Sequence, residues 1–161
     1  MNSGNDPTGD AVESDAPAGF TPLHLPGPFV DINGPLLARY TDSKFRIGLR
    51  LEERHCNAVG ICHGGMHATF ADLQIAIGIV VQANVRAFMP TINLSLDYVA
   101  PGRIGDWLEG ETEVIHTTRN LAFGSCILSA NGSTVVRASA VCKIPSQEDL
   151  RFTLENLLPH A

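Results

Sequence analysis

Basic residues are scarce in this sequence. It contains 11 Lys and Arg residues against 17 Asp and Glu, and Lys44 and Lys143 are the only lysines. A surface that binds nucleic acid normally needs a cluster of positive charge. The net charge of −6 and the pI near 5.4 therefore argue against nucleic acid as a partner.

The sequence also lacks the patterns of membrane and secreted proteins. The apolar run at 75–85 is too short to cross a bilayer, and it follows an aspartate. The N-terminal residues do not show the basic and then apolar pattern of a signal peptide. Four cysteines in a chain of 161 residues do not indicate a disulfide framework. We therefore expect a cytoplasmic protein that does not enter a membrane.

The chain is long enough for one folded domain with a sizeable core. Residues 1–19 contain four acidic residues and no Lys or Arg, so we expect them to form a disordered acidic tail. Residues 20–42 contain four prolines, and we expect this segment to wrap around the body before the first long strand. The folded domain would then comprise residues 43–145, followed by a short C-terminal helix within 146–161.

Apolar and polar residues alternate along several runs of this domain, as in half-buried strands. The first run places four apolar side chains on one face: Phe45, Ile47, Leu49 and Leu51. The later runs cover 91–98, 107–116, 121–130 and 134–144, with Glu109, Glu111 and Glu113 on one solvated face. Asn131-Gly132 between the last two runs is typical of a tight hairpin. The pattern predicts an α+β domain with five to six antiparallel strands.

One long, mostly apolar helix is inserted after the first strand. It should begin near Gly64 and extend to Val81, with Asp72 as its only charge. One stripe of this helix carries bulky residues suited to burial against a sheet: Met66, Phe70, Leu73, Ile77 and Val80. A second stripe surrounds Asp72 with small residues and one isoleucine: Gly65, Ala68, Ala76 and Ile79. An acid in such surroundings needs a distant arginine as its partner or has a chemical function.

The helix N-terminus offers a site for negative charge. The first-turn N–H groups of a helix have no partner inside it, and the Gly64-Gly65 pair leaves them uncovered. A developing oxyanion would fit there, and a phosphate group is the alternative. At the other end of the domain, Ser146 and Asp149 resemble a capping box for the terminal helix.

The order of these residues resembles the hotdog-fold acyl-CoA thioesterases of the phenylacetate-pathway (PaaI-like) group. The resemblance covers about residues 29–144 and depends on one set of spaced residues: Asn57-x-x-Gly60-x-x-His63-Gly64-Gly65, Asp72, Thr91 and Tyr98-x-x-Pro101. It implies a curled antiparallel sheet around the central helix, and two subunits that join their sheets edge to edge. The expected assembly is a homodimer or a homotetramer built as a dimer of dimers, without a metal or another cofactor.

The resemblance also implies a role for each matched residue. Asn57 and the Gly64 amide would polarise the thioester carbonyl, and Asp72 from the other subunit would act as general base or nucleophile. Thr91 would help to position the attacking water molecule, and His63 is a further candidate catalytic residue. The acyl-CoA would contact Gly65, Met66 and His67, with Phe70, Phe88 and Met89 also near the acyl group. Arg103 and Arg119 are the candidates for contact with the phosphates of coenzyme A.

Several other interpretations of these residues remain open. His63 and His67, four residues apart near Cys56 and Cys62, could form a metal site, although no His-Glu-x-x-His or CxxC pattern is present. Either cysteine could instead be a nucleophile. A hotdog hydratase acting on enoyl or hydroxyacyl thioesters would also use an acid and a histidine. A non-catalytic acyl-CoA-binding module is the alternative from a different class.

Overall fold

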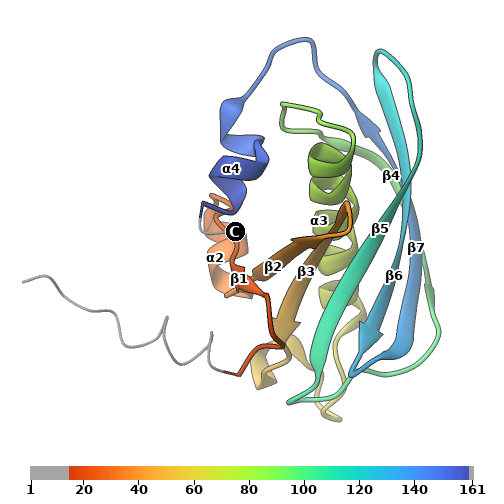
Figure 1. Ribbon diagram of the computed structural model, residues 1–161. Coiled ribbons are helices and arrows are strands. Elements are labelled where there is room, and N and C mark those ends of the chain that lie inside the picture. The colour runs from red at the N-terminus through yellow and green to blue at the C-terminus, as the bar shows by residue number, and fades with distance from the viewer. Residues whose placement is uncertain (1–14, 160–161) are drawn as a thin grey trace, which may run out of the picture.

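A seven-stranded antiparallel sheet curls around one long helix, α3, Gly64–Gln82 (Figure 1). The structure is a computed structural model that describes residues 15–159. The strand order is β1-β2-β3-β5-β6-β7-β4. The strands are β1 Thr21–Pro22, β2 Leu37–Thr41, β3 Lys44–Arg50, β4 Thr91–Tyr98, β5 Trp107–Thr117, β6 Leu121–Ala130 and β7 Ser133–Lys143. This arrangement confirms the hotdog fold expected from the sequence.

The sheet has two more strands than the five long strands identified from the sequence. Strands β1 and β2 pair with each other, and both lie in the proline-containing segment that was expected only to wrap around the body. These strands were not predicted because prolines interrupt the segment, and β2, which begins two residues after Pro35, is only 5 residues long. Other predictions are confirmed: Phe45 and Ile47 on β3 are fully buried. Asn131 and Gly132 have φ of 48° and 82°, as a tight hairpin turn requires.

Four short helical segments complete the described chain: α2 Pro28–Asn33, η1 Glu53–His55, η2 Leu150–Phe152 and α4 Leu154–Leu157. The predicted capping box at Ser146 is wrong. Asp149 itself caps η2, because its side chain accepts a hydrogen bond from the Arg151 N–H. Leu157 and Leu158 are buried as expected, but Leu150 is exposed.

The concave face of the sheet accepts α3 closely because glycines lie where the two elements meet. A Cβ atom on Gly78 would lie 2.3 Å from the Thr112 Oγ1 atom on β5. A Cβ on Gly124 of β6 would lie 2.8 Å from the Cδ1 atom of Ile79. Ile79 was expected on the stripe around Asp72, but it faces the sheet and is fully buried. Contacts this short mean that a side chain at either glycine would force its neighbour to move, so these glycines allow the close approach of helix and sheet.

A buried glutamine joins α3 to two strands where these strands separate. Strand β3 pairs with β5 only from Gly48 onward, so the preceding β3 backbone needs other partners. The Gln74 Oε1 atom accepts the Ile47 N–H at 2.7 Å, and its Nε2 donates to the Phe45 carbonyl at 2.9 Å. Gln74 Nε2 also donates to the Thr112 hydroxyl at 2.8 Å. This glutamine therefore replaces part of the missing strand ladder.

The second helix face packs against the two ends of the chain rather than against the sheet. We call residues 24–33 and 150–158 the terminal cap. The His24 N–H donates to the Leu157 carbonyl at 2.9 Å, which joins the two halves of the cap. Figure 1 shows α2 and α4 next to each other, on the side of α3 away from β6 and β7. Leu73, Ile77 and Val80 face this cap, so the expected burial of their stripe against the sheet is wrong.

Helix α3 would be long and apolar enough to cross a membrane by length and composition alone, since it has 19 residues. In the folded chain 56% of its most apolar window is buried against the sheet and the terminal cap. Its apolar character is therefore accounted for by its position as the core helix.

The expected acidic tail falls partly outside the described residues, since residues 1–14 are not among them. Residues 15–19 lie against the sheet. Asp15 forms an ion pair with Arg50 at 3.0 Å, and the Arg39 guanidinium donates to the Ala18 carbonyl at 3.2 Å.

We expect the substitution Gln74→Leu to destabilise the fold strongly. It leaves the Phe45 carbonyl and the Ile47 N–H buried without partners, which should cost about 3 kcal/mol of unfolding free energy. Urea denaturation followed by circular dichroism measures this change. Gln147→Leu in the exposed segment after β7 is the matched control and should stay within about 0.5 kcal/mol of wild type. Equal unfolding midpoints for the two variants would contradict the role of Gln74.

Candidate active site

Asn57 lies in a tight loop, and the β-bridge between Cys56 and Cys62 at the base of this loop leads into the start of α3. The Asn57 Oδ1 atom accepts hydrogen bonds from the Val59 N–H at 3.1 Å and the Ile61 N–H at 3.4 Å. The Nδ2 group has no partner within the described chain. Because the loop uses the oxygen, the Asn57 Nδ2 hydrogens are free to donate to a ligand.

The neighbouring helix start leaves one backbone donor free. His63 is the N-cap residue, and its Nδ1 atom accepts the Gly65 N–H at 2.9 Å. The His63 carbonyl accepts the Met66 and His67 N–H groups. The Gly64 N–H has no acceptor among residues 15–159. The helix therefore directs one uncommitted N–H, with the positive end of its dipole, toward the Asn57 loop.

Asp72 lies two turns further along α3 and is hydrogen-bonded to Thr91 at the start of β4. The Thr91 hydroxyl donates to Asp72 Oδ1 at 2.6 Å. Asp72 is half-buried, and no Lys or Arg in the described ranges lies within ion-pair distance of it. The alternative of a salt bridge to a distant arginine is therefore wrong within one chain.

Strand β4 contacts both ends of this site. Thr91 at its start binds Asp72, and the Tyr98 hydroxyl at its end donates to the Gly64 carbonyl at 3.1 Å. β4 is an edge strand of the sheet, and Ile92 and Tyr98 are 59% and 57% exposed. The sequence pattern predicted a half-buried strand here, but β4 has no neighbour on its outer side in a single chain.

A cavity of about 220 Å³ opens beside Asp72, between α3 and the terminal cap. Helix α3 contributes Asp72, Leu73, Ala76, Ile77 and Val80 to its wall. Leu25, Pro26, Val30, Phe88, Met89 and Phe152 complete the apolar part of the wall, and Thr91 lies beside Asp72. Phe88 and Met89, two of the residues expected near the acyl group, line this cavity, whereas Met66, His67 and Phe70 do not.

The structure brings only some of the predicted substrate contacts together. Gly65 is exposed at the helix start, while Met66 and His67 are buried, and burial lowers the pKa of His67. Arg103 lies beside the Asn57 loop, because it forms a β-bridge with Ile61. Arg119 lies beyond the far end of β5, a strand of 11 residues and about 35 Å. The two arginines therefore lie at opposite ends of the sheet.

The cysteines beside this site are poorly suited to act as nucleophiles. Burial raises the pKa of the Cys62 thiol to about 12, and burial followed by the Asp106 charge raises the pKa of Cys56. The two histidines of the alternative metal site also point to different surroundings: His63 caps the helix, and His67 lies beside the Tyr98 ring. In the described part of the chain, no three His, Cys, Asp or Glu side chains are grouped as metal ligands.

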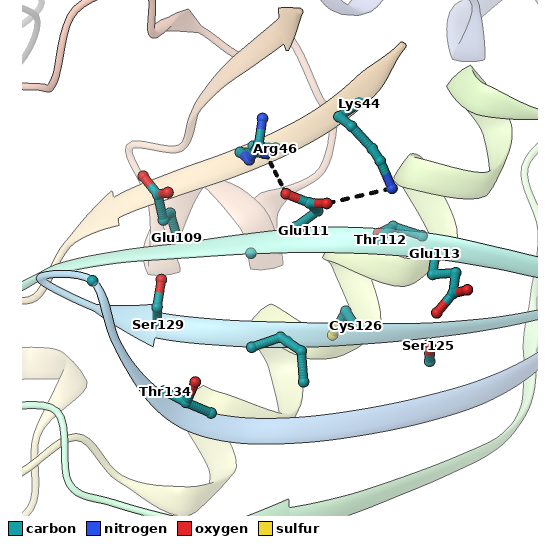
Figure 2. A pocket seen from close by; sticks show the side chains of 13 residues that line it. Lys44, Arg46, Glu109, Glu111, Thr112, Glu113, Ser125, Cys126, Ser129 and Thr134 are labelled. Atoms are coloured by element: carbon teal, nitrogen blue, oxygen red, sulfur yellow. Dashed lines mark hydrogen bonds and ion pairs between the residues drawn. The ribbon is translucent and has the colours of Figure 1, made fainter. Parts of the chain in front are cut away.

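A larger hollow of about 430 Å³ lies on the outer face of the sheet and is separate from Asp72 (Figure 2). The predicted row of acids is there, and Glu111 lies between Lys44 and Arg46 and pairs with both. Glu111 is paired with both neighbouring basic side chains, and the hollow lies on the outer face of the sheet, so it is explained as a solvated face.

Several residues that line the cavity beside Asp72 could not be identified from the sequence. Phe152 and Leu25 reach the cavity from opposite ends of the chain, and no local pattern relates them to α3. Ala76 did carry a signal, because it follows Asp72 by four residues on the same helix face.

Comparison with known proteins agrees with this geometry. A family model described as the thioesterase superfamily matches residues 59–136. A Pseudomonas aeruginosa protein, provisionally named an esterase, is 35% identical over 130 residues, or 80% of this chain and 97% of that protein. The human acyl-coenzyme A thioesterase 13 is 28% identical over 81 residues, or 50% of this chain and 57% of that protein.

A solved structure gives the same result. A protein of Ralstonia eutropha JMP134, described as related to phenylacetic acid degradation and provisionally as a thioesterase, has a TM-score of 0.66 and 26% identity. The alignment covers 74% of this chain and 92% of that one. With its hotdog fold and these relatives, the chain belongs to the thioesterase superfamily, whose general reaction is the hydrolysis of thioesters.

Proposed function

We propose that this protein hydrolyses an acyl-CoA thioester to the free acid and CoA, in active sites formed between two copies of the chain. The observation that carries the proposal is the arrangement along β4, which contacts Asp72 at one end and the start of α3 at the other. The names of relatives such as acyl-coenzyme A thioesterase 13 support this substrate class.

The thioester carbonyl oxygen binds between the Gly64 N–H and the Asn57 Nδ2 group. Both donors lack partners among the described residues, and the helix dipole adds positive potential at Gly64. These donors stabilise the negative charge that develops on the oxygen in the transition state. Donors of this kind typically contribute about 100- to 1,000-fold to the rate.

Asp72 of the same chain is too far away to attack that carbonyl. Eight helical residues separate Asp72 from Gly64, which is about 12 Å along the axis. A second copy removes this difficulty if the free edges of two β4 strands pair antiparallel about a two-fold axis. Thr91 of one chain then lies beside Tyr98 of the other, so each Asp72 approaches the opposite helix start.

In the assembled site the Asp72 carboxylate activates the nucleophile. As general base, it takes a proton from a water molecule that attacks the carbonyl carbon; the C–S bond then breaks, and the proton passes to the departing CoA thiolate. As nucleophile, it attacks that carbon itself, the C–S bond breaks to release CoA, and water then hydrolyses the mixed anhydride to the free acid and regenerates Asp72. Thr91 fixes the carboxylate with its 2.6 Å hydrogen bond, which leaves the second oxygen free to react. Arg103, beside the Asn57 loop, is positioned to meet the phosphates of coenzyme A.

The hydratase alternative would use His63 to exchange protons with the substrate. The His63 Nδ1 atom accepts the Gly65 N–H, so only Nε2 is available for this exchange, and the relatives named above are described as esterases or thioesterases. Hydration also leaves the thioester intact, so release of free thiol distinguishes the two reactions. Saturable acyl-CoA binding without thiol release would instead establish the non-catalytic binding module.

We expect Asp72→Asn to lower kcat by about 100-fold or more, because it removes the general base or nucleophile. Thiol release from a panel of acyl-CoAs measures the loss. Asp42→Asn is the matched control, because Asp42 is exposed in the β2–β3 turn at φ 53°, which asparagine tolerates equally well. If the Asp72 variant stays within about threefold of wild type, Asp72 has no chemical role.

A mixing experiment tests whether two chains share each site. Asp72→Asn and Asn57→Ala should each be nearly inactive alone. Subunits mixed under dissociating conditions and reassembled should regain about a quarter of the wild-type rate, since half the dimers are mixed and each has one intact site. Mixed dimers that remain inactive, with wild-type dimers recovering fully after the same treatment, would mean that the site lies within one chain.

A further inference from the structure

We propose that the acyl group of the substrate binds in the Asp72 cavity beneath the terminal cap, and that Phe152 sets the longest acyl group accepted. The preferred substrates are then compact, wholly apolar acyl groups, either one unsubstituted ring or a chain of medium length. This inference rests on the proposed thioesterase function, and it concerns only what the site selects.

The cavity wall allows only apolar contacts away from the reacting carbonyl. Asp72 and Thr91 are its only residues with polar side chains, and they are hydrogen-bonded to each other at the rim. Every other lining residue is aliphatic, aromatic, methionine or proline. A hydroxyl or charged group deep in the acyl moiety would lose its water without gaining a hydrogen bond. The cavity should therefore reject polar acyl groups.

The size of the cavity sets an upper limit on the acyl group. A closed apolar cavity of about 150 Å³ is known to hold one benzene ring. By the same scale, a cavity of about 220 Å³ accommodates roughly eight or nine carbon atoms. The carbonyl itself lies outside at the oxyanion donors, so an octanoyl or a phenylacetyl group fits and a hexadecanoyl chain does not.

The direction of the cavity agrees with this limit. Asp72 lies at one end, and the wall continues along α3 through Ala76 to Val80, about 12 Å further along the helix axis. Ala76 lies one turn beyond Asp72 and is the smallest side chain of this wall. An acyl chain that starts at Asp72 therefore passes over Ala76 and ends near Val80.

Phe152 forms the partition at the end of this path. A second hollow of about 450 Å³ lies beyond the C-terminal end of α3, and Val80 and Phe152 line both spaces. Phe152 is 5% exposed and packs against the Phe88 ring at 5.4 Å. The Asp149 N–H donates to the Arg86 carbonyl at 2.8 Å, which fixes the chain just before it. Removal of the Phe152 ring would join the acyl cavity to the outer hollow.

The test is the chain-length profile of kcat/KM for acyl-CoAs from acetyl to hexadecanoyl, together with phenylacetyl-CoA and its 4-hydroxy derivative. Wild type should prefer octanoyl- and phenylacetyl-CoA. Phe152→Ala should raise the ratio of dodecanoyl- to octanoyl-CoA activity about tenfold or more. Phe29→Ala is the matched control, because Phe29 is 60% exposed on α2 and does not line the cavity, and it should leave the profile unchanged.

Ala76→Phe is a second variant that fills the cavity without weakening the cap. It should lower the ratio of octanoyl- to acetyl-CoA activity about 100-fold. Either of two results would overturn the proposal: a wild-type enzyme equally active on octanoyl- and hexadecanoyl-CoA, or a folded Phe152→Ala protein with the wild-type profile. Ala76→Phe with full octanoyl-CoA activity would overturn it as well.

A binding measurement separates this inference from the proposed function. Phenylacetamide is neutral and carries the ring of a compact acyl group, and its binding can be measured without any reaction. Calorimetric titration of wild type should give saturable binding that Ala76→Phe abolishes, even if no acyl-CoA is hydrolysed. Thiol release without phenylacetamide binding, at concentrations where octanoyl-CoA saturates the enzyme, would overturn the cavity assignment and leave the thioesterase function standing.

Discussion

The hydrogen bonds that Gln74 makes between β3 and β5 are the constraint on which the site depends. A fully buried amide that binds two backbone groups and one hydroxyl can be satisfied in only one rotation of α3. Gln82, two turns later, accepts the Phe45 N–H at 3.0 Å and donates to the Thr112 carbonyl at 3.2 Å, so the C-terminal half of the helix is fixed at two points. Residues two apart differ by about 200° around a helix, so Asp72 must face away from β3 and β5.

Edge strand β4 connects Asp72 to the start of α3. Its hydrogen bonds to Asp72 and Gly64 hold the two ends of the strand against the helix, while its outer backbone edge stays unpaired. An exposed edge with large apolar side chains normally has a partner, because it would otherwise promote aggregation. Strand β4 contacts Asp72 and Gly64 at its opposite ends, so the two residues are far apart within one chain. Antiparallel pairing of two β4 strands would bring Asp72 of one chain close to Gly64 of the other.

Local patterns in the sequence were sufficient for the long elements. Alternation located β3 to β7, the glycine pair located the start of α3, and the resemblance to a known family pointed to Asn57, Asp72 and Thr91 as candidate site residues. The sequence did not predict which face of α3 packs against the sheet. Gln74 is polar, so its burial could not be expected without knowing that β3 and β5 separate beside it. The cap side of the cavity was not predictable, since Leu25 and Phe152 are brought together by the fold across more than a hundred residues.

In the proposed mechanism, the terminal cap makes catalysis and selectivity separable in this chain. The family model matches residues 59–136, which include Gly64, Asp72 and Thr91. Both halves of the cap lie outside that region, yet they cover the helix face beside Asp72 and turn it into a cavity. A change in the cap alters the volume beside the reacting group without touching the hydrogen bonds of Gln74 or β4. On this proposal, substrate range can change while the geometry of Asn57, Gly64 and Asp72 stays the same, because different segments of the chain carry the two properties.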